Sequence, residues 1–80
     1  MERSEIFDKI VDIASDVLGV DASSITEKTT FDDLNADSLD RLQLVTAMED
    51  EFELEIDDEK LMTIASVSDA IEAIESAQED

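Results

Sequence analysis

The chain has 80 residues, with 24 acidic against five basic side chains and neither cysteine nor histidine. These features exclude disulfide bonds and thiolate metal sites, and they remove the commonest general base and the commonest metal ligand. The formal net charge of −19 disfavours nucleic acids and anionic membranes as partners and favours basic protein surfaces or cations.

Apolar residues are numerous enough to form a core, so we expect one folded domain over residues 1–80 and not a disordered chain. The N-terminal stretch MERSEIFDKI lacks the apolar segment of a signal peptide. No apolar run approaches the roughly 20 residues that a membrane span needs. We therefore expect a cytoplasmic, monomeric protein.

Residues 5–18 predict an amphipathic helix, because apolar side chains recur on one side at a period of about 3.6 residues. These apolar residues are Ile6, Phe7, Ile10, Val11, Ile13, Ala14, Val17 and Leu18. Gly19 follows the last of them and is expected to cap the C-terminal end of the helix.

Residues 20–36 lack a sustained period and are rich in Ser, Thr, Asp and Asn, which compete for backbone hydrogen bonds. The segment is predicted to be a long loop, which a single helical turn can interrupt. A loop of this length in a small domain is often functional. Its expected anchors in the core are Val20, Ile25, Phe31 and Leu34.

The second predicted helix covers residues 38–52. Its inner face is expected to hold Leu42, Leu44, Val45, Met48 and Phe52, and its outer face Asp40, Gln43, Ala47, Asp50 and Glu51. Leu39 lies outside the buried face, where a solvated helix would normally have a polar residue.

Residues 53–57 are predicted to connect this helix to a short helix over 58–64, capped by Asp57. A last helix is predicted over 69–77 with Ser68 as its N-cap. The residues expected to face inward are Leu61, Met62 and Ile64 in the short helix and Ala70, Ile71, Ile74 and Ala77 in the last one. The predicted fold is all-α, a small four-helix bundle of three longer helices and one short helix, with the long loop between the first two.

The segment around Ser38 has three possible chemical interpretations. Asp33, Asn35 and Asp37 resemble the opening of a calcium loop, but Ser38 and Leu44 stand where that loop needs glycine and glutamate. We therefore expect no specific metal site, and only weak, nonspecific binding of divalent ions to clustered acids. A nucleophilic serine needs a neighbouring base, and the chain has no histidine.

The third interpretation is helix capping. Asp37 and Ser38 suit the first positions of a helix, and Asp40 suits its positive end. Capping explains these residues, but it does not explain an exposed Leu39. Nor does it explain the run of acids that follows, which is Glu49, Asp50, Glu51, Glu53, Glu55, Asp57, Asp58 and Glu59.

The motif Leu34-Asn35-Ala36-Asp37-Ser38-Leu39-Asp40 is similar to that of the acyl carrier proteins of dissociated fatty acid synthesis. The similarity continues through Leu44-Val45-x-Ala47-x-Glu49-x-Glu51-Phe52, Glu55-Ile56 and Asp58-Glu59. The resemblance implies a 4′-phosphopantetheine arm on Ser38, flanked by Asp37 and Leu39. It implies that a separate transferase installs the arm from coenzyme A, and that acyl groups are carried as thioesters.

The resemblance also implies docking to basic surfaces of the phosphopantetheinyl transferase and of fatty acid synthesis or acyltransferase enzymes. The residues expected to bind these partners are Leu39, Asp40, Thr46, Glu49, Asp50, Glu53, Asp58 and Glu59. The residues expected to line the site of the acyl chain are Leu42, Leu44, Val45, Phe52 and Ile64. Departures from the family pattern at Arg41, Gln43 and Asn35 concern partner choice more than the carrier role, and Asn also tolerates the backbone angles of the turn. Asp57 stands where a proline is common and still suits a helix cap.

Two alternatives stay open on the sequence. A carrier of the same fold could serve polyketide assembly, a specialised lipid or aminoacyl transfer such as D-alanylation. An acidic interaction module could instead use Ser38 only as a helix cap.

Overall fold

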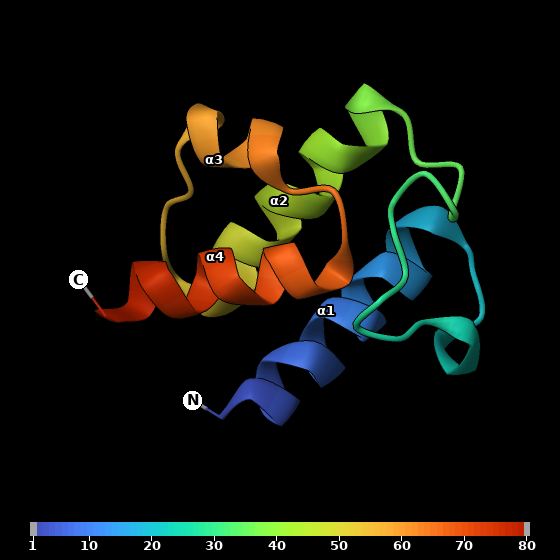
Figure 1. Cartoon of the computed structure of the whole chain (residues 1–80), viewed down its shortest axis with the longest axis horizontal. Coiled ribbons are helices and arrows are strands. Elements are labelled where there is room, and N and C mark those ends of the chain that lie inside the picture. Colours follow the sequence, from blue (N-terminus) through green and yellow to red (C-terminus); the bar gives the residue numbers. More distant parts are fainter. Residues whose placement is uncertain (1, 80) are drawn as a thin grey trace.

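A computed structural model describes residues 2–79, and the side chains of Asp58 and Glu79 lie outside that description. The elements are α1 (Arg3–Leu18), the 3-10 turn η1 (Ala22–Ser24), α2 (Ser38–Phe52), α3 (Asp58–Thr63) and α4 (Val67–Glu79). Helix α1 packs against both α2 and α4, and the short α3 lies beside α2 (Figure 1). No strand occurs within residues 2–79, so the predicted all-α bundle of three longer helices and one short helix is confirmed.

Among the described residues the core is wholly apolar, and no polar or charged residue is buried there. This composition is expected, because burying a polar or charged group without a partner costs free energy. Its members are Ile6, Ile10, Val11, Ala14, Ile25, Phe31, Ala36, Leu44, Val45, Met48, Phe52, Ile64, Val67, Ala70, Ile71, Ala73 and Ile74. No helix in the described part of the chain has the length and hydropathy to cross a bilayer.

Three residues predicted to face inward neither belong to the core nor pack against it. Leu42 is 49% exposed. Residues three and four positions apart share one face of a helix, so the residue on the same face as the buried Leu44 and Val45 is Arg41. Met62 is 86% exposed, because Leu61 and Ile64 turn the other side of α3 inward. Ala77 is only half-buried, near the end of α4.

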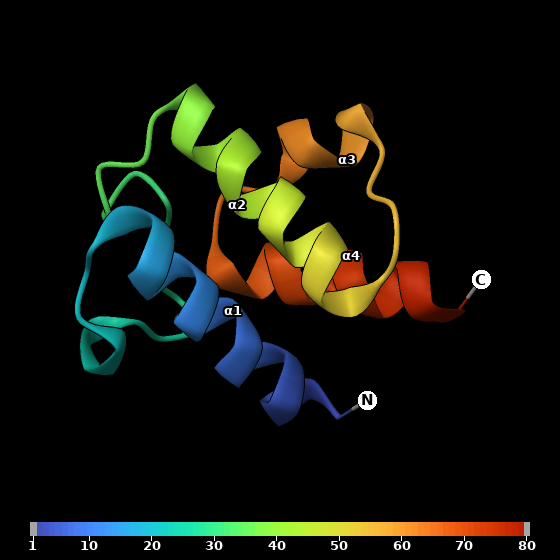
Figure 2. The same ribbon diagram turned by 180° about the vertical axis from the view of Figure 1, so that it is seen from behind.

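The long loop has the predicted helical turn, η1, and all four predicted anchors pack into or against the core. It lies at the end of the molecule opposite both termini (Figures 1 and 2). The Phe31 N–H donates to the Ala65 carbonyl at 3.0 Å, and Thr30 forms an isolated antiparallel bridge with Ser66. The loop is therefore attached to the segment that leads into α4.

This attachment corrects the predicted start of the last helix. Helix α4 begins at Val67, two residues before the predicted start, and Ser68 is not its N-cap. The N–H groups of Val67 and Ser68 donate to the carbonyls of Thr29 and Glu27 at 2.9 and 3.0 Å. The Ser66 hydroxyl accepts the N–H three residues later at 3.2 Å. Loop carbonyls thus accept from two of the free donors at this helix end, which a local sequence pattern cannot indicate.

Two smaller corrections concern the other helix starts. Helix α1 begins at Arg3, two residues before its predicted start. The Arg3 guanidinium pairs with Glu27 at 2.7 Å and with Glu75 at 3.0 Å, so it ties α1 to the loop and to α4. The hydrogen bond to Glu27 raises the pKa of Arg3 above its ordinary value. Asp57 holds the N-cap position of α3, but its side chain makes no capping hydrogen bond.

Gly19 ends α1 as predicted, with φ at 68° and its N–H donating to the Ser15 carbonyl. A Cβ atom built there meets nothing within 4 Å, so any cost of a side chain comes from the backbone conformation alone. We expect Gly19→Ala to lower the free energy of unfolding by about 1–2 kcal/mol in urea titrations. Gly19→Asn should lose clearly less, because Asn tolerates this conformation. Equal losses for the two variants would contradict this explanation.

Candidate functional site at the start of α2

Reciprocal hydrogen bonds fix the first turn of α2. The Asp37 carboxylate accepts the Asp40 N–H at 2.9 Å, and the Asp40 carboxylate accepts the Asp37 N–H at 3.4 Å. This arrangement is a capping box, which satisfies two backbone donors at the helix start. The capping role predicted for Asp37 is confirmed, and Ser38 is the first residue of the helix.

A tight turn delivers the chain to this cap. Asn35 has a positive φ of 59°, a conformation that Asn tolerates better than most residues do. Its N–H donates to the Asp32 carbonyl at 3.0 Å, and the Ala36 N–H donates to the Phe31 carbonyl at 2.9 Å. Because Phe31 and Ala36 are both buried, the turn is anchored in the core directly before Ser38.

Ser38 is exposed and borders a surface hollow of about 280 Å³, together with Arg41, Leu61 and Met62. Its hydroxyl forms no hydrogen bond with any other described residue, so the oxygen is available to a partner. The hollow has an apolar wall from α3 and a cation from α2. This combination suits a group with an anionic head and an apolar or neutral body.

Three large apolar side chains of α2 and α3 are exposed to solvent, and one of them, Met62, lines this hollow. Leu39 is 62% exposed, as expected from its position on the helix. Leu42 and Met62 were predicted to be buried, and their exposure adds them to the same surface. Isolated exposed apolar residues need no explanation, but three large ones beside a free hydroxyl indicate a contact surface.

An interior cavity of about 10 Å³ lies between α2 and α3. It is lined by Phe31, Arg41, Leu44, Val45, Met48, Leu61 and Ile64. Of the residues predicted to line an acyl site, Leu44, Val45 and Ile64 line this cavity, whereas Leu42 and Phe52 do not. The sequence did not identify Met48 or Arg41 as lining residues of this cavity. Burial of Met48 was predicted, and the position of Arg41 one turn before Leu44 was the available signal.

The acids predicted to bind partners have different environments. Asp50, Glu53 and Glu59 are exposed, whereas Asp40 is half-buried and held in the capping box. The side chain of Asp58 lies outside the described part of the structure. Thr46 is exposed, and its hydroxyl donates to the Leu42 carbonyl at 2.9 Å.

Glu49 has a structural role that the sequence did not indicate. Its carboxylate is half-buried and accepts the Ile56 N–H at 2.9 Å, and its carbonyl accepts the Leu54 N–H at 3.1 Å. Glu49 therefore holds the connector between α2 and α3, where Glu53 has a positive φ of 55°. A substitution of Glu49 would change this connector as well as the surface charge.

The sequence profile of the family described as "PP-binding: Phosphopantetheine attachment site" matches residues 8–74. The crystal structure of an acyl carrier protein from Thermotoga maritima is 40% identical, with a TM-score of 0.87 over 99% of this chain and 93% of that one. This chain belongs to the acyl carrier protein family. The acyl carrier protein from Enterococcus faecalis is also similar, with 37% identity and a TM-score of 0.79 over 96% of this chain and 99% of that one.

The chain is accordingly a carrier and not a catalyst, and its cofactor is phosphopantetheine. The residues present fit that cofactor. A free hydroxyl stands at a helix N-terminus, where backbone N–H groups and the helix dipole favour a phosphate. Arg41 adds a positive charge to the same hollow, and Leu61 and Met62 give it an apolar side.

Asp37→Ala should lower the free energy of unfolding by about 1 kcal/mol, because it leaves the Asp40 N–H without its acceptor. Asp50→Ala removes the same charge from an exposed position of α2 and should change stability by less than about 0.5 kcal/mol. Urea unfolding of both variants measures the difference. Equal stabilities would mean that the capping box contributes nothing.

Proposed function

We propose that Ser38 is the attachment point of the phosphopantetheine arm, and that this carrier shuttles acyl groups as thioesters between enzymes of fatty acid biosynthesis. The observation that supports Ser38 is its free hydroxyl at the capped start of α2, bordering the surface hollow. The role implies a cytoplasmic, monomeric protein.

Other serines within the matched range are less suitable. The hydroxyls of Ser15 and Ser24 donate to backbone carbonyls, and those of Ser66 and Ser68 accept hydrogen bonds from Asp69 and Arg3. Ser23 is exposed on the short turn η1, which is too short to provide the N-terminus of a full helix. Ser38 alone combines exposure with the start of a long helix and with the hollow.

The attachment step requires a partner enzyme. The Ser38 oxygen attacks a phosphorus atom of the coenzyme A pyrophosphate, forms a new P–O bond and displaces adenosine 3′,5′-bisphosphate. The serine proton goes to a base of the transferase, because this chain has no histidine and its nearby carboxylates form the capping box. The attached group contributes a thiol, which holds an acyl group as a thioester.

The carrier's own residues then have two tasks. The start of α2 and Arg41 stabilise the phosphodiester charge on Ser38. The interior cavity lined by Leu44, Val45 and Ile64 offers an apolar space to the acyl chain. Transfer of that chain out of water is favourable in proportion to the apolar area that becomes buried.

Docking uses charge and apolar contact together. The exposed acids Asp50, Glu53 and Glu59 attract basic surfaces of the transferase and of the acyl-transfer enzymes, with Asp40, Glu49 and Asp58 as further members of this acidic face. Leu39 and Thr46 contact the partner close to the arm. Exposed charge pairs increase the rate of encounter more than the strength of binding, which suits a carrier that visits many enzymes.

The pathway is supported by the motif around Ser38 and by the similarity to acyl carrier proteins. Carriers for polyketides, specialised lipids or D-alanine would share the fold. Transfer of a malonyl group to the arm followed by elongation with a ketoacyl synthase supports fatty acid synthesis. Loading by a D-alanine ligase in place of malonyl transfer would reject it.

The first test is covalent attachment. Incubation with coenzyme A and a broad phosphopantetheinyl transferase should add one phosphopantetheinyl group to the wild-type chain and to Ser23→Ala, but not to Ser38→Ala. Intact mass spectrometry measures the product. An unchanged wild-type mass with a competent transferase would reject the carrier role, and modification of Ser38→Ala would reject the assigned residue.

The second test concerns docking. Asp50→Lys should raise the KM of the transferase for the carrier by roughly three- to ten-fold at low salt, because an attraction becomes a repulsion. Asp8→Lys makes the same charge change at an exposed position of α1, a helix that holds none of the residues assigned to the acidic face, and should have little effect. The difference should shrink as salt is added. Equal KM values for the two variants at low salt would show that the acidic face is wrongly placed.

A further inference from the structure

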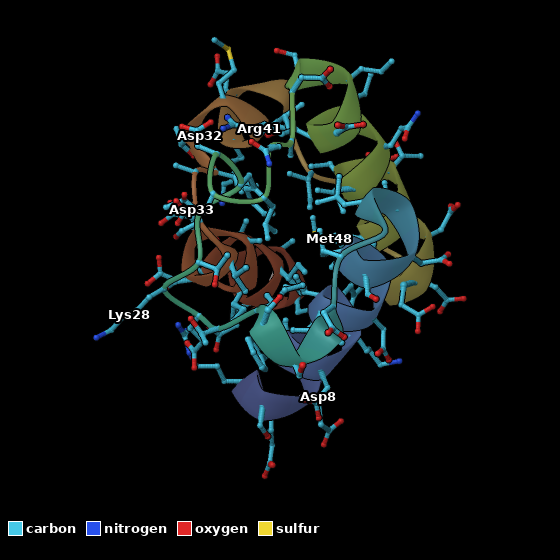
Figure 3. The ribbon with its side chains drawn as sticks, turned by 90° about the vertical axis from the view of Figure 1, so that its right-hand side faces the viewer. Asp8, Lys28, Asp32, Asp33, Arg41 and Met48 are labelled. Carbon is cyan, nitrogen blue, oxygen red and sulfur yellow. The ribbon has the colours of Figure 1, made fainter. Side chains whose placement is uncertain are left out.

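Arg41 occupies an unusual position on α2. It stands one turn before Leu44 and Val45, on the side of the helix that otherwise enters the core. Its side chain is 29% exposed, and its guanidinium donates to the Asp32 carboxylate at 2.9 Å. Figure 3 shows Asp32 and Arg41 next to each other, one on the loop and the other on α2.

The turn that contains Asp32 holds this acid in place. Its carbonyl accepts the Asn35 N–H at 3.0 Å, and the neighbouring Phe31 is buried. The next acid, Asp33, does not pair with Arg41 in the structure, and its carboxylate accepts the Thr30 N–H at 3.3 Å. Asp32 is therefore the specific partner of the guanidinium, although its own side chain is 87% exposed.

Arg41 separates two spaces. Together with Leu61 it lines both the hollow of about 280 Å³ beside Ser38 and the interior cavity of about 10 Å³. The long apolar stem of an arginine can cover apolar surface while its charged head stays at the water boundary. A path from Ser38 to the interior therefore passes between the Arg41 stem and Leu61.

The interior cavity is closed in this state. A cavity needs about 10–15 Å³ of accessible space to hold one water molecule. The present cavity barely reaches that size, so an acyl chain of several carbons requires displacement of lining side chains. Among those side chains, Arg41 alone is held at its far end by an ion pair with a described residue outside the cavity lining.

We propose that the Arg41–Asp32 ion pair holds the Arg41 stem over the entrance to the interior cavity and so sets the shortest acyl chain that enters it. The inference rests on the proposed attachment of the arm to Ser38. An exposed ion pair can shift an equilibrium by up to about five-fold. Each methylene that enters an apolar space shifts it by about four-fold. The pair therefore adds a cost equal to about one methylene to that of displacing the packed lining side chains, and so raises the minimum length of an acyl chain that enters.

The test compares chains of two lengths on four proteins. Wild type, Asp32→Asn, Arg41→Met and the control Asp33→Asn are loaded from butyryl- and octanoyl-coenzyme A by the transferase. The half-life of each thioester in hydroxylamine measures how well the chain is shielded. Amide chemical shifts of Met48 and Ile64 report independently whether the chain lies in the cavity.

Asp32→Asn and Arg41→Met should lengthen the butyryl half-life by about two- to five-fold, because neither retains the ion pair. Asp33→Asn loses the same charge without losing the pair, and it should match wild type. The octanoyl half-life should be long in all four proteins and change little. High salt should lengthen the wild-type butyryl half-life but not that of Asp32→Asn.

Each other result overturns the inference. If the butyryl half-lives of Asp32→Asn and Arg41→Met equalled that of wild type, the pair would not control entry. An equal gain in Asp33→Asn would assign the effect to general charge. Unshielded octanoyl groups with unmoved Met48 and Ile64 shifts would show that the cavity holds no chain. Failure of wild type to gain any mass on incubation would instead reject the proposed function, and the inference with it.

Discussion

The capping box between Asp37 and Asp40 is the interaction on which the rest of the site depends. It fixes the residue at which α2 begins. Because the helical period is constant, this starting point also determines which side chains face inward. Once the helix starts at Ser38, that hydroxyl stands free at the positive helix end. The same register places Arg41 one turn before Leu44 on the inner side. The proposed attachment site and the proposed cavity entrance therefore both depend on one local set of hydrogen bonds.

The scarcity of positive charge imposes a second constraint. The chain has five basic residues and a net charge of −19, so few of its acids can form an ion pair within the chain. Arg3 and Lys9 pair with acids distant in sequence, and Arg41 pairs with Asp32 of the loop before its helix, so each pair joins separate segments. The Lys9–Glu51 pair links α1 to the end of α2, and the hydrogen bond to Glu51 raises the pKa of Lys9 above its ordinary value. Other acids of α2 and the connector remain exposed to solvent and to basic partners.

Sequence patterns predicted what depends on local chemistry. The apolar period of α1, the glycine at its end and the Asp37 cap are all determined by residues within a few positions of each other. The start of α4 was predicted two residues late, because carbonyls from the distant loop accept its first N–H groups. Leu42 was placed inside because it is apolar, whereas helix geometry gives the inner position to Arg41. The spacing to Leu44 was a signal for this position in the sequence, and the structure adds Asp32 as the partner of its charge.

The cavity and the core share the same side chains, which limits how a carrier of this size can store a chain. Leu44, Val45 and Met48 are among the most buried residues of α2, and they also line the cavity. A permanently open site among them would remove packing contacts and lower stability in proportion to its volume. A nearly closed cavity avoids that loss when the arm is empty. In the proposed function, an acyl chain that enters the cavity replaces one set of apolar contacts with another, so its own burial drives the opening.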